Sequence, residues 1–335
     1  MSWETYLMHW VEHFGGWVAL TDELLHRASG VVELPPDPQS IERGLRRLSR
    51  RGNKEGGQYG RWMLRFFGLP ADVSTWLKWM GQYHSRFSDL PLALRAEQLD
   101  LWDRAPMSGS SHAAWLHLGK ASLYKRTRDE DATHQEFERA LASAKRAGAE
   151  AILETKLLEA RLASDRKDHA ACKALLSETN ALLHHEDTSS AISWEDRLLY
   201  TSRLNDQRAY QLLHPEDGAP ALDEAEALYA SIESGAHDEL SFAAYQRHLG
   251  LGYCQWKRGA RERAAEHCEL AVMHAGDGGF VRLRVIALNL WSRVVSEDAE
   301  GPLRARARRL ARRLEDEDLL ILGDQARSIE QRGGQ

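Results

Sequence analysis

Cysteine is scarce in this 335-residue sequence, and its three cysteines (Cys172, Cys254 and Cys268) form no Cys-x-x-Cys pair. An odd number of unpaired cysteines argues against a disulfide framework and favours a reducing compartment, so we expect the cytoplasm. Long apolar runs are missing too, because no stretch approaches the ~20 consecutive apolar residues that a membrane helix needs. The first ten residues, MSWETYLMHW, lack a basic leader segment. We therefore expect neither a secretory signal nor a membrane partner.

Patterns that could carry catalysis or bind a metal are few, and each has an ordinary explanation. Residues 9–13 read HWVEH and match the HxxEH motif, in which two histidines one helical turn apart bind zinc. Trp10 belongs to an apolar helical stripe, however, and no third acidic ligand follows in a matching context. Gly119-Lys120 lacks the glycine spacing of a phosphate-binding loop, and the serines of residues 108–111 lack the glycines of a nucleophile elbow. The sequence therefore predicts no enzyme, with no catalytic residue, metal or cofactor.

Apolar residues with helical spacing are abundant. They make up 43% of a chain that is 28% charged, which is enough to bury a core and too much for a disordered chain. The first such stripe places Trp3, Leu7, Trp10 and Phe14 at i, i+4, i+7 and i+11. Glycine and proline separate further helical stretches, and no segment alternates as a strand does. We therefore predict an all-α fold.

The chain divides by composition, since eight of its eleven tryptophans lie in the first 115 residues. We predict an N-terminal helical domain over residues 1–105. Its helices are expected over about 3–14, 17–29, 38–51, 59–67, 73–86 and 91–103. The loop PMSGSS at residues 106–111 is the expected boundary, and a second domain of paired helices is expected over 112–331.

Residues 251–272, LGYCQWKRGARERAAEHCELAV, carry the clearest repeat pattern. They resemble a tetratricopeptide repeat, in which Leu251-Gly252 match the first helix, Gly259 the turn, and Ala264 the small residue where the two helices touch. Cys268 and Ala271 take the next two places of the pattern. Weaker matches put Thr133, Ala171 and Ala225 at the position of Ala264, with spacings of 38, 54 and 39 residues instead of the usual ~34. The resemblance over 112–331 implies an irregular α-solenoid.

A stack of such repeats has a concave face lined by the first helix of each pair, where a partner protein or peptide binds. The resemblance places seven candidate partner-binding residues there: Trp115, Lys125, Arg126, Leu249, Tyr253, Trp256 and Lys257. Alternatively, the aromatic residues among them only pack against the next repeat. Some relatives bind C-terminal carboxylates through a lysine-asparagine clamp. The corresponding places here hold Leu118 and Ser122, Lys156 and Ala160, and Leu249 and Tyr253, so this clamp is absent.

Positive charge is concentrated in residues 40–66, which carry +6 while the remainder carries −12. Within this segment Arg43, Arg46, Arg47 and Arg50 lie on one side of the predicted helix, opposite Ile41, Leu45 and Leu48. With the preceding helix they form a candidate helix-turn-helix over residues 17–51, which places a helix in the DNA major groove. The connector over 30–37 is longer than the usual turn of ~3–4 residues. The arginines alternatively pair with the acidic repeat domain.

The leading hypothesis is a non-enzymatic adaptor or regulator that binds a protein segment on the concave face of the repeats. The alternative is a DNA-binding transcriptional regulator whose repeats sense a signal or mediate assembly. An enzyme ranks third. The pattern identifies neither the partner nor the oligomeric state.

Overall fold

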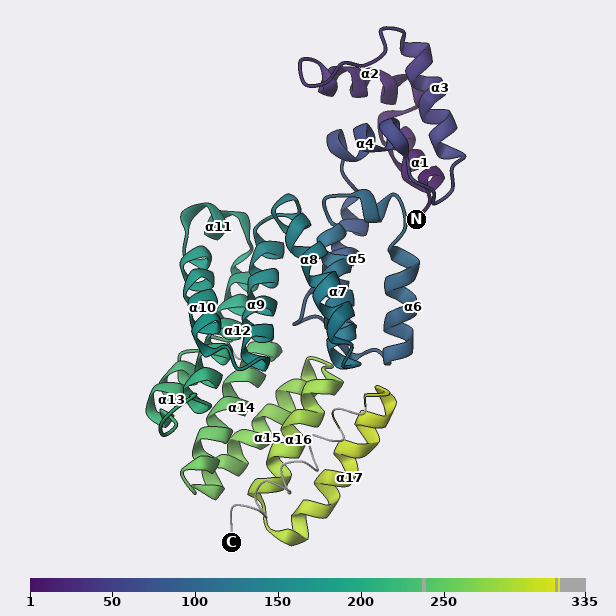
Figure 1. The fold of residues 1–335 in the computed structure, drawn as a ribbon. Helices are drawn as coiled ribbons and strands as arrows, with labels where there is room; N and C mark the ends of the chain where they lie inside the picture. The colour runs from purple at the N-terminus through teal and green to yellow at the C-terminus, as the bar shows by residue number, and fades with distance from the viewer. Residues whose placement is uncertain (237–238, 317–318, 320–335) are drawn as a thin grey trace. The chain divides into compact units, whose positions relative to one another are not determined.

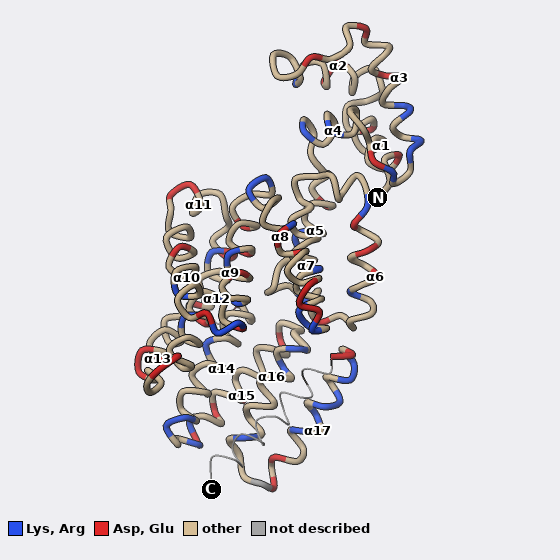
Figure 2. The backbone as a smooth tube through the Cα atoms, in the orientation of Figure 1, with Lys and Arg blue, Asp and Glu red and all other residues tan. Residues whose placement is uncertain are grey.

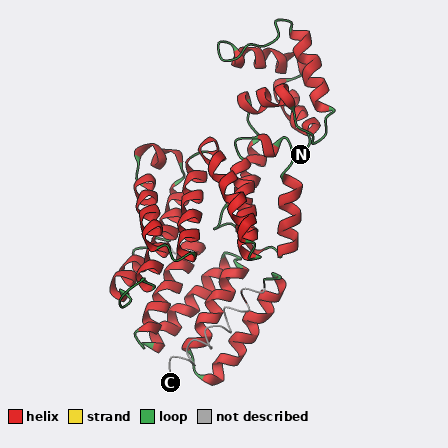
Figure 3. Cartoon of the chain, in the orientation of Figure 1, coloured by secondary structure: helices red, strands yellow, loops and turns green. Residues whose placement is uncertain are grey.

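The computed structural model describes residues 1–236, 239–316 and 319. Within these residues all regular structure is helical and there is no strand, as Figures 1 and 3 show, which confirms the all-α prediction. None of the described helices has both the length and the apolar character to cross a bilayer. The end of the predicted repeat region, residues 320–331, lies outside the described residues.

The chain forms two compact units whose boundaries do not follow the expected loop at 106–111. Unit 1 contains residues 1–82, 96–125 and 129–148, and unit 2 contains residues 83–95, 126–128 and those from 149 onward. The helix pair that was assigned to the first repeat therefore belongs largely to unit 1. In contrast, the short segment 83–95 belongs to unit 2.

Unit 1 begins with four helices that pack on one another: α1 (Trp3–Phe14), α2 (Trp17–Ala28), α3 (Pro38–Ser49) and α4 (Gly57–Phe66). The start of α3 follows from its sequence, because the Asp37 carboxylate accepts hydrogen bonds from the backbone N–H groups of Gln39 and Ser40, and Pro38 takes the first helical position. The unit continues with α5 (Ala71–Gly81), most of α6 (Leu92–Trp102), the short 3₁₀ turn η2 (Met107–Gly109), α7 (Ala113–Arg126) and α8 (Glu130–Ala147).

The helix expected over 73–86 was predicted too long, since α5 ends at Gly81. Gly81 packs so closely on Trp115 that a Cβ there would lie 2.5 Å from the Trp115 backbone oxygen. Gln82 then takes an extended conformation with ψ 129°. Ser85 starts a new 3₁₀ turn, η1 (Arg86–Asp89), by accepting a hydrogen bond from Phe87 N–H. The chain between α5 and α6 is consequently an irregular segment with one short turn.

Unit 2 consists of helical hairpins arranged in two layers. The first helices are neighbours of one another: α9 (Ala149–Asp165), α12 (Trp194–Leu213), α14 (Ser241–Lys257) and α16 (Val281–Val294). Their hairpin partners are α10 (His169–Leu183), α13 (Leu222–Ala230), α15 (Arg261–Asp277) and α17 (Glu297–Arg313). The short helix α11 (Glu186–Ala191) joins the first two hairpins. Figure 1 shows these helices from teal through green to yellow.

Four interhelical turns share one backbone geometry. Arg128, Lys167, Gly259 and Gly279 all adopt left-handed φ angles, of 60°, 61°, 80° and 70°. In each turn the next residue donates its N–H to the carbonyl five positions earlier, at 2.8–3.0 Å. This is the bond pattern of a helix that ends on a left-handed residue, which glycine adopts without strain and other residues adopt at a cost. The turns after α7 and α9 are thus equivalent to the turn at Gly259 although they lack glycine.

The contact between α14 and α15 has the small residues that the repeat pattern requires. A Cβ on Gly252 would lie 3.2 Å from Cys268 Sγ and 3.4 Å from the Ala264 backbone oxygen. Ala264 and Cys268 are fully buried at this contact. The two helices therefore approach closely only because position 252 has no side chain.

Candidate functional site

A buried ion pair connects two of the first helices of unit 2. Arg203 on α12 donates from Nη1 and Nη2 to the two carboxylate oxygens of Glu154 on α9, at 2.6 and 2.7 Å. The side chains are only 5% and 4% exposed. Burial lowers the pKa of Arg203, but the charge of Glu154 and its hydrogen bonds outweigh this effect and raise it above the ordinary value. The pair is a rigid polar anchor because two parallel bonds fix both side chains.

Tyr83, from the segment between α5 and α6, contacts all four first helices. Its backbone N–H donates to Glu154 Oε1 at 3.2 Å, and the guanidinium of Arg203 lies 5.0 Å from its ring centroid. Its ring meets Phe242 of α14 edge to face at 6.3 Å. Arg282 of α16 donates to its hydroxyl at 2.6 Å and covers the ring at 4.7 Å. We call Glu154, Arg203, Phe242 and Arg282 the Tyr83 band.

The residues after Tyr83 continue along this band. The His84 ring is buried between Tyr200 and Phe242, with centroid distances of 5.3 and 5.8 Å. Asp89 Oδ1 accepts the Arg282 backbone N–H at 2.6 Å. Burial raises the pKa of Asp89 although Arg282 opposes the shift. The Tyr83 band is therefore already occupied by residues 83–89 of the same chain.

A second group of side chains lies further along the same first helices. It is a row of aromatic side chains with a basic group at each end, and we call it the aromatic ladder: Arg161, Tyr210, His214, Tyr253, Trp256 and Lys257. Arg161 and Tyr210 each follow a member of the ion pair by seven residues, which is roughly 10 Å along a helix. Their spacing places the ladder beyond the Tyr83 band, toward the ends of α9, α12 and α14.

Each member of the ladder touches the next. The Arg161 guanidinium lies 5.3 Å from the Tyr210 ring, Tyr210 lies 4.4 Å from His214, and His214 lies 6.1 Å from Tyr253. Tyr253 meets Trp256 at 5.6 Å, and the Lys257 ammonium lies 4.7 Å from the Trp256 ring. These distances are typical of aromatic and cation–π contacts.

The aromatic ladder is partly exposed to solvent, and its basic side chains give it positive charge. Tyr210 is 38% exposed, the Arg161 side chain is 45% exposed, and Lys257 is exposed as well. Burial lowers the pKa of His214, and the positive charges of Lys257 and Arg161 lower it further. Asp165 partly offsets this field through its 3.3 Å ion pair with Arg161.

Asp206 lies on α12 between the two groups. Its carboxylate accepts a hydrogen bond from the Tyr229 hydroxyl and another from Gln246 Nε2, both at 3.3 Å. Burial raises the pKa of Asp206 to about 6, although Arg161, Tyr229 and Arg203 all act to lower it. An unfolded Asp titrates near ~3.9, so the folded chain binds the extra proton between these two values. The contribution of Asp206 to stability is therefore lost as the pH rises from about 4 through about 6.

We accordingly expect Asp206→Asn to gain stability relative to the wild type as the pH rises. The difference in unfolding free energy between the two proteins should shift in favour of the variant by ~1–2 kcal/mol between pH 4.5 and pH 7.5. Denaturant titrations at both pH values measure it, with Asp217→Asn in an exposed loop as the control. A difference that is the same at both pH values would show that Asp206 titrates normally.

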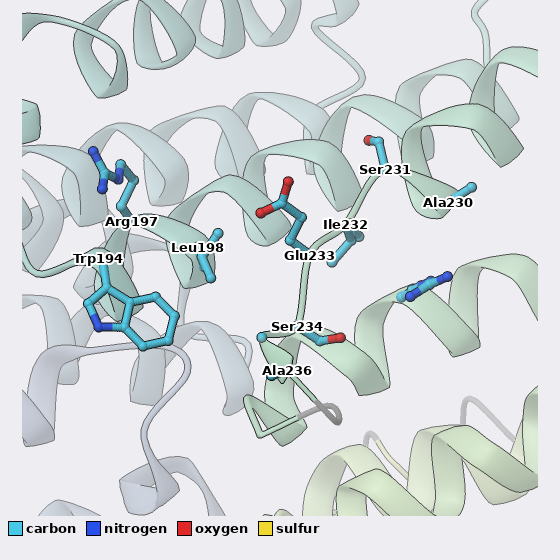
Figure 4. Close-up of a pocket in the computed structure, with 11 residues that line it drawn as sticks. Trp194, Arg197, Leu198, Ala230, Ser231, Ile232, Glu233, Ser234 and Ala236 are labelled. Carbon is cyan, nitrogen blue, oxygen red and sulfur yellow. The ribbon is translucent and has the colours of Figure 1, made fainter.

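A separate cavity of about 990 Å³ lies beside the start of α12. Trp194, Arg197 and Leu198 project from α12, and residues 230–236 form the facing side (Figure 4). Arg247 of α14 also lines it, and its buried Nε has no hydrogen-bond partner. The cavity is wide open and includes the exposed carboxylate Glu233, so its lining does not select one ligand charge.

The arginines of α3 lie as the sequence predicts, with Arg43, Arg46, Arg47 and Arg50 exposed and Ile41, Leu45 and Leu48 buried. Arg46 is engaged within unit 1, because it pairs with Glu42 at 2.7 Å and lies over the Trp17 ring at 4.7 Å. Arg43 donates to Ser40 Oγ at 3.0 Å. Figure 2 shows this run of basic residues along α3.

Comparison with known proteins gives no relative. No family model matches the chain, and neither a curated protein nor a solved structure matches it significantly.

Among the residues predicted to bind a partner, three come together in the aromatic ladder: Tyr253, Trp256 and Lys257. Tyr253 and Trp256 are half-buried and also pack against a core cluster that includes Leu290 and Val294 of α16. Both rings therefore pack against the next first helix and keep part of their surface accessible. Lys257 is the exposed member.

The other four do not join them. Trp115 is 2% exposed in the core of unit 1, so it presents almost no surface to a partner. The cause is its contact with Gly81, which fixes α7 against α5. Lys125 also belongs to unit 1, Arg126 forms an ion pair with Asp316, and Leu249 packs against the cores around α15 and α16.

Sequence reasoning missed Arg161 and Tyr210 as ladder members. Tyr253 stands six residues before the left-handed Gly259, and Arg161 stands six residues before the left-handed Lys167. The sequence comparison had instead aligned Ala160 with Tyr253, because no glycine marked the turn. The signal that finds Arg161 is the Lys-Asp pair at 167–168, in which Asp168 caps α10.

Proposed function

We propose that this chain is a non-enzymatic adaptor or regulator that binds a partner protein segment along the aromatic ladder of unit 2. The observation that carries the proposal is the ladder itself: six contiguous aromatic and basic side chains from three neighbouring first helices, with Tyr210, Arg161 and Lys257 open to solvent. Exposed aromatic groups beside arginine are the composition that protein interfaces favour. A row that crosses several helices also suits an extended segment better than a small ligand.

The charge of the ladder indicates the chemistry of this segment. Arg161 and Lys257 lie at its two ends, and both lower the pKa of His214 between them. An acidic segment with one or more aromatic residues would pair its carboxylates with these cations and stack on the tyrosines. The cytoplasm remains the expected location.

We further propose that unit 2 is an irregular tetratricopeptide-like solenoid. The shared turn geometry at Lys167, Gly259 and Gly279 and the close contact of Gly252 with Ala264 support this proposal. In such an array the first-helix layer is the concave, partner-binding side. The ladder lies on this layer.

The test is a selection of random displayed peptides on the full chain, followed by affinity measurements on the enriched peptides. We expect acidic, aromatic-containing peptides to be enriched. Arg161→Glu/Lys257→Glu should weaken their binding at least ~100-fold, because each reversal turns an attraction into a repulsion worth ~1–2 kcal/mol or more. The melting temperature should change little, since neither side chain is buried: Arg161 is 45% exposed and Lys257 is exposed as well.

The matched control is Lys173→Glu/Arg263→Glu, which makes the same change in charge on the exposed faces of α10 and α15. It should bind the selected peptides as the wild type does. Enrichment of basic peptides, or equal losses in both double variants, would contradict binding at the ladder.

A second candidate function, nucleic-acid binding by unit 1, is favoured by one observation. Arg43, Arg47 and Arg50 form an exposed basic row on α3, whose opposite edge is fully buried. Such a helix, packed on α2, fits the arrangement in which the second arm of a helix-turn-helix enters the major groove. Arg46 is less available because it pairs with Glu42. The DNA-binding regulator is thus the alternative, with unit 2 as its sensing or assembly part.

This alternative makes a separate prediction. If the α3 arginines grip phosphates, affinity for mixed-sequence duplex DNA should fall with salt at a log–log slope of about −0.9 per contact. Changing all four arginines to glutamate should abolish binding and leave the helix content intact, because Ile41, Leu45 and Leu48 are unchanged. A fluorescence titration from ~50 mM salt upward measures it. No binding by the wild type at the lowest salt would remove the alternative.

A further inference from the structure

The path of residues 83–89 across unit 2 is unusual for a connection between helices. It does not run over the hairpin turns but over the first-helix layer, where Tyr83 alone contacts α9, α12, α14 and α16. In a helical-repeat array this is the layer on which partner segments bind. The chain thus places one of its own segments where a partner would lie.

The contacts of this segment are also those of a bound peptide. One backbone N–H, one phenol hydroxyl and one carboxylate make polar contacts to Glu154, to Arg282 and to the Arg282 backbone. The His84 ring adds two more, with Nδ1 3.5 Å from Arg203 Nη1 and Nε2 3.9 Å from Asp196 Oδ1. Phe87 and His84 supply buried rings. Backbone bonds together with a few buried side chains are a usual way in which a protein surface holds a peptide segment.

The contacts between this segment and the Tyr83 band are incomplete at two residues. Tyr83 remains 40% exposed although its hydroxyl and ring are engaged. The second carboxylate oxygen of Asp89, Oδ2, is buried without a hydrogen-bond partner. A buried acceptor that lacks a donor costs free energy, so the fit of Asp89 to the band can be improved upon.

We propose that residues 83–89 are an intramolecular ligand of the first-helix layer, and that a partner segment bearing a tyrosine, with an acidic residue about six positions later, displaces them from the Tyr83 band. This inference rests on the proposed function, since it adds a second, regulated part to the same binding layer. A partner that reaches both the ladder and the band binds with both sets of contacts. A partner that contacts only the ladder leaves residues 83–89 bound to the Tyr83 band.

The tether sets the strength of this competition. A segment joined to its site by a short linker acts at an effective concentration in the millimolar range. A free peptide of the same sequence therefore competes poorly with the wild-type chain. Weakening the chain's own segment, with the band itself unchanged, should open the site to the free peptide.

The experiment uses a fluorescent peptide with the sequence of residues 83–95 and the full chain. Tyr83→Ala/Asp89→Ala removes two of the anchors of the segment but none of the band residues. We expect the peptide to bind this variant at least ~10-fold more tightly than the wild type. A peptide with alanine in place of its tyrosine should lose this gain. Leu94→Ala, at an exposed position of α6 that follows the segment, should behave as the wild type does.

A second measurement covers the case in which the double variant folds poorly. Tyr83→Phe removes only the hydroxyl that Arg282 contacts and keeps the ring. Added peptide should raise the melting temperature of Tyr83→Phe and of the double variant, and should raise that of the wild type less, because a ligand stabilises the form that binds it. Equal peptide affinities for all chains, or no rise in any melting temperature, would overturn the proposal.

The result also separates this inference from the proposed function. Arg161→Glu/Lys257→Glu changes the ladder and leaves the Tyr83 band intact. If the 83–95 peptide binds Tyr83→Ala/Asp89→Ala more tightly than the wild type, while selected acidic peptides bind Arg161→Glu/Lys257→Glu as they bind the wild type, the ladder proposal fails and the intramolecular ligand stands. If the ladder variant loses its acidic peptides but no chain exchanges the 83–95 peptide, the opposite holds.

Discussion

Glu154→Ala is expected to destabilise unit 2 by about 3–5 kcal/mol, because it leaves the buried guanidinium of Arg203 without its carboxylate. Both Arg203 Nη atoms lose their carboxylate acceptors, and the side chain is too buried for water to replace them. The Tyr83 backbone N–H loses the same carboxylate. Chemical denaturation followed by circular dichroism measures the loss.

Two comparisons show whether the loss of stability in Glu154→Ala comes from the unpaired buried charge. Glu154→Leu/Arg203→Met removes both charges and should recover most of the loss, since apolar groups of similar volume often replace a buried pair without cost. Glu178→Ala breaks the exposed pair with Lys156 and should cost no more than ~1 kcal/mol. If Glu154→Ala were as mild as Glu178→Ala, water would have to reach Arg203, and the ion pair would not anchor the segment.

Helix periodicity predicted the fold class because it depends only on neighbours in sequence. The stripe of α1 and the capped start of α3 at Asp37 are local features, and the structure has them where expected. The turns between helices were predicted less completely than the helices themselves. Glycine marks the turn at Gly259, but Arg128 and Lys167 adopt the same left-handed geometry with side chains present. Glycine is favoured at such positions but is not required, and the second repeat, which lacks it, was aligned one residue out of register, with Ala160 in the place of Arg161.

The site could be predicted only in part, for a related reason. Tyr253, Trp256 and Lys257 lie within one turn of α14, and their shared side follows from helical spacing. The pairing of Glu154 with Arg203 joins residues 49 positions apart, and Tyr83 is a further 71 positions from Glu154. No local pattern encodes such contacts. The segment 83–89 was instead expected to begin inside a helix, and Gly81, the last residue of α5, packs closely on Trp115, which is 34 residues away.

Ala264→Trp should destabilise the chain by ~1–3 kcal/mol or more, because it forces a large ring into the contact of α14 with α15. Ala264 is fully buried, its backbone oxygen lies beside Gly252, and Cys268 fills the next position of the same interface. Gly252 has no side chain that could move aside to make room for the new ring. The two helices themselves must therefore separate. Thermal unfolding of the variant measures the loss.

The register of the repeat is what this substitution tests. Glu269→Trp places the same ring on the exposed face of α15 and should leave the melting temperature nearly unchanged. Gly252→Ala adds a single carbon at the facing position, 3.2 Å from Cys268 Sγ, and should cost less than Ala264→Trp while acting on the same contact. Because both changes separate the same two helices, their effects should not add in the double variant. Additive losses, or an unchanged melting temperature for Ala264→Trp, would mean that α14 and α15 do not meet at these residues and that the repeat pattern was assigned in the wrong register.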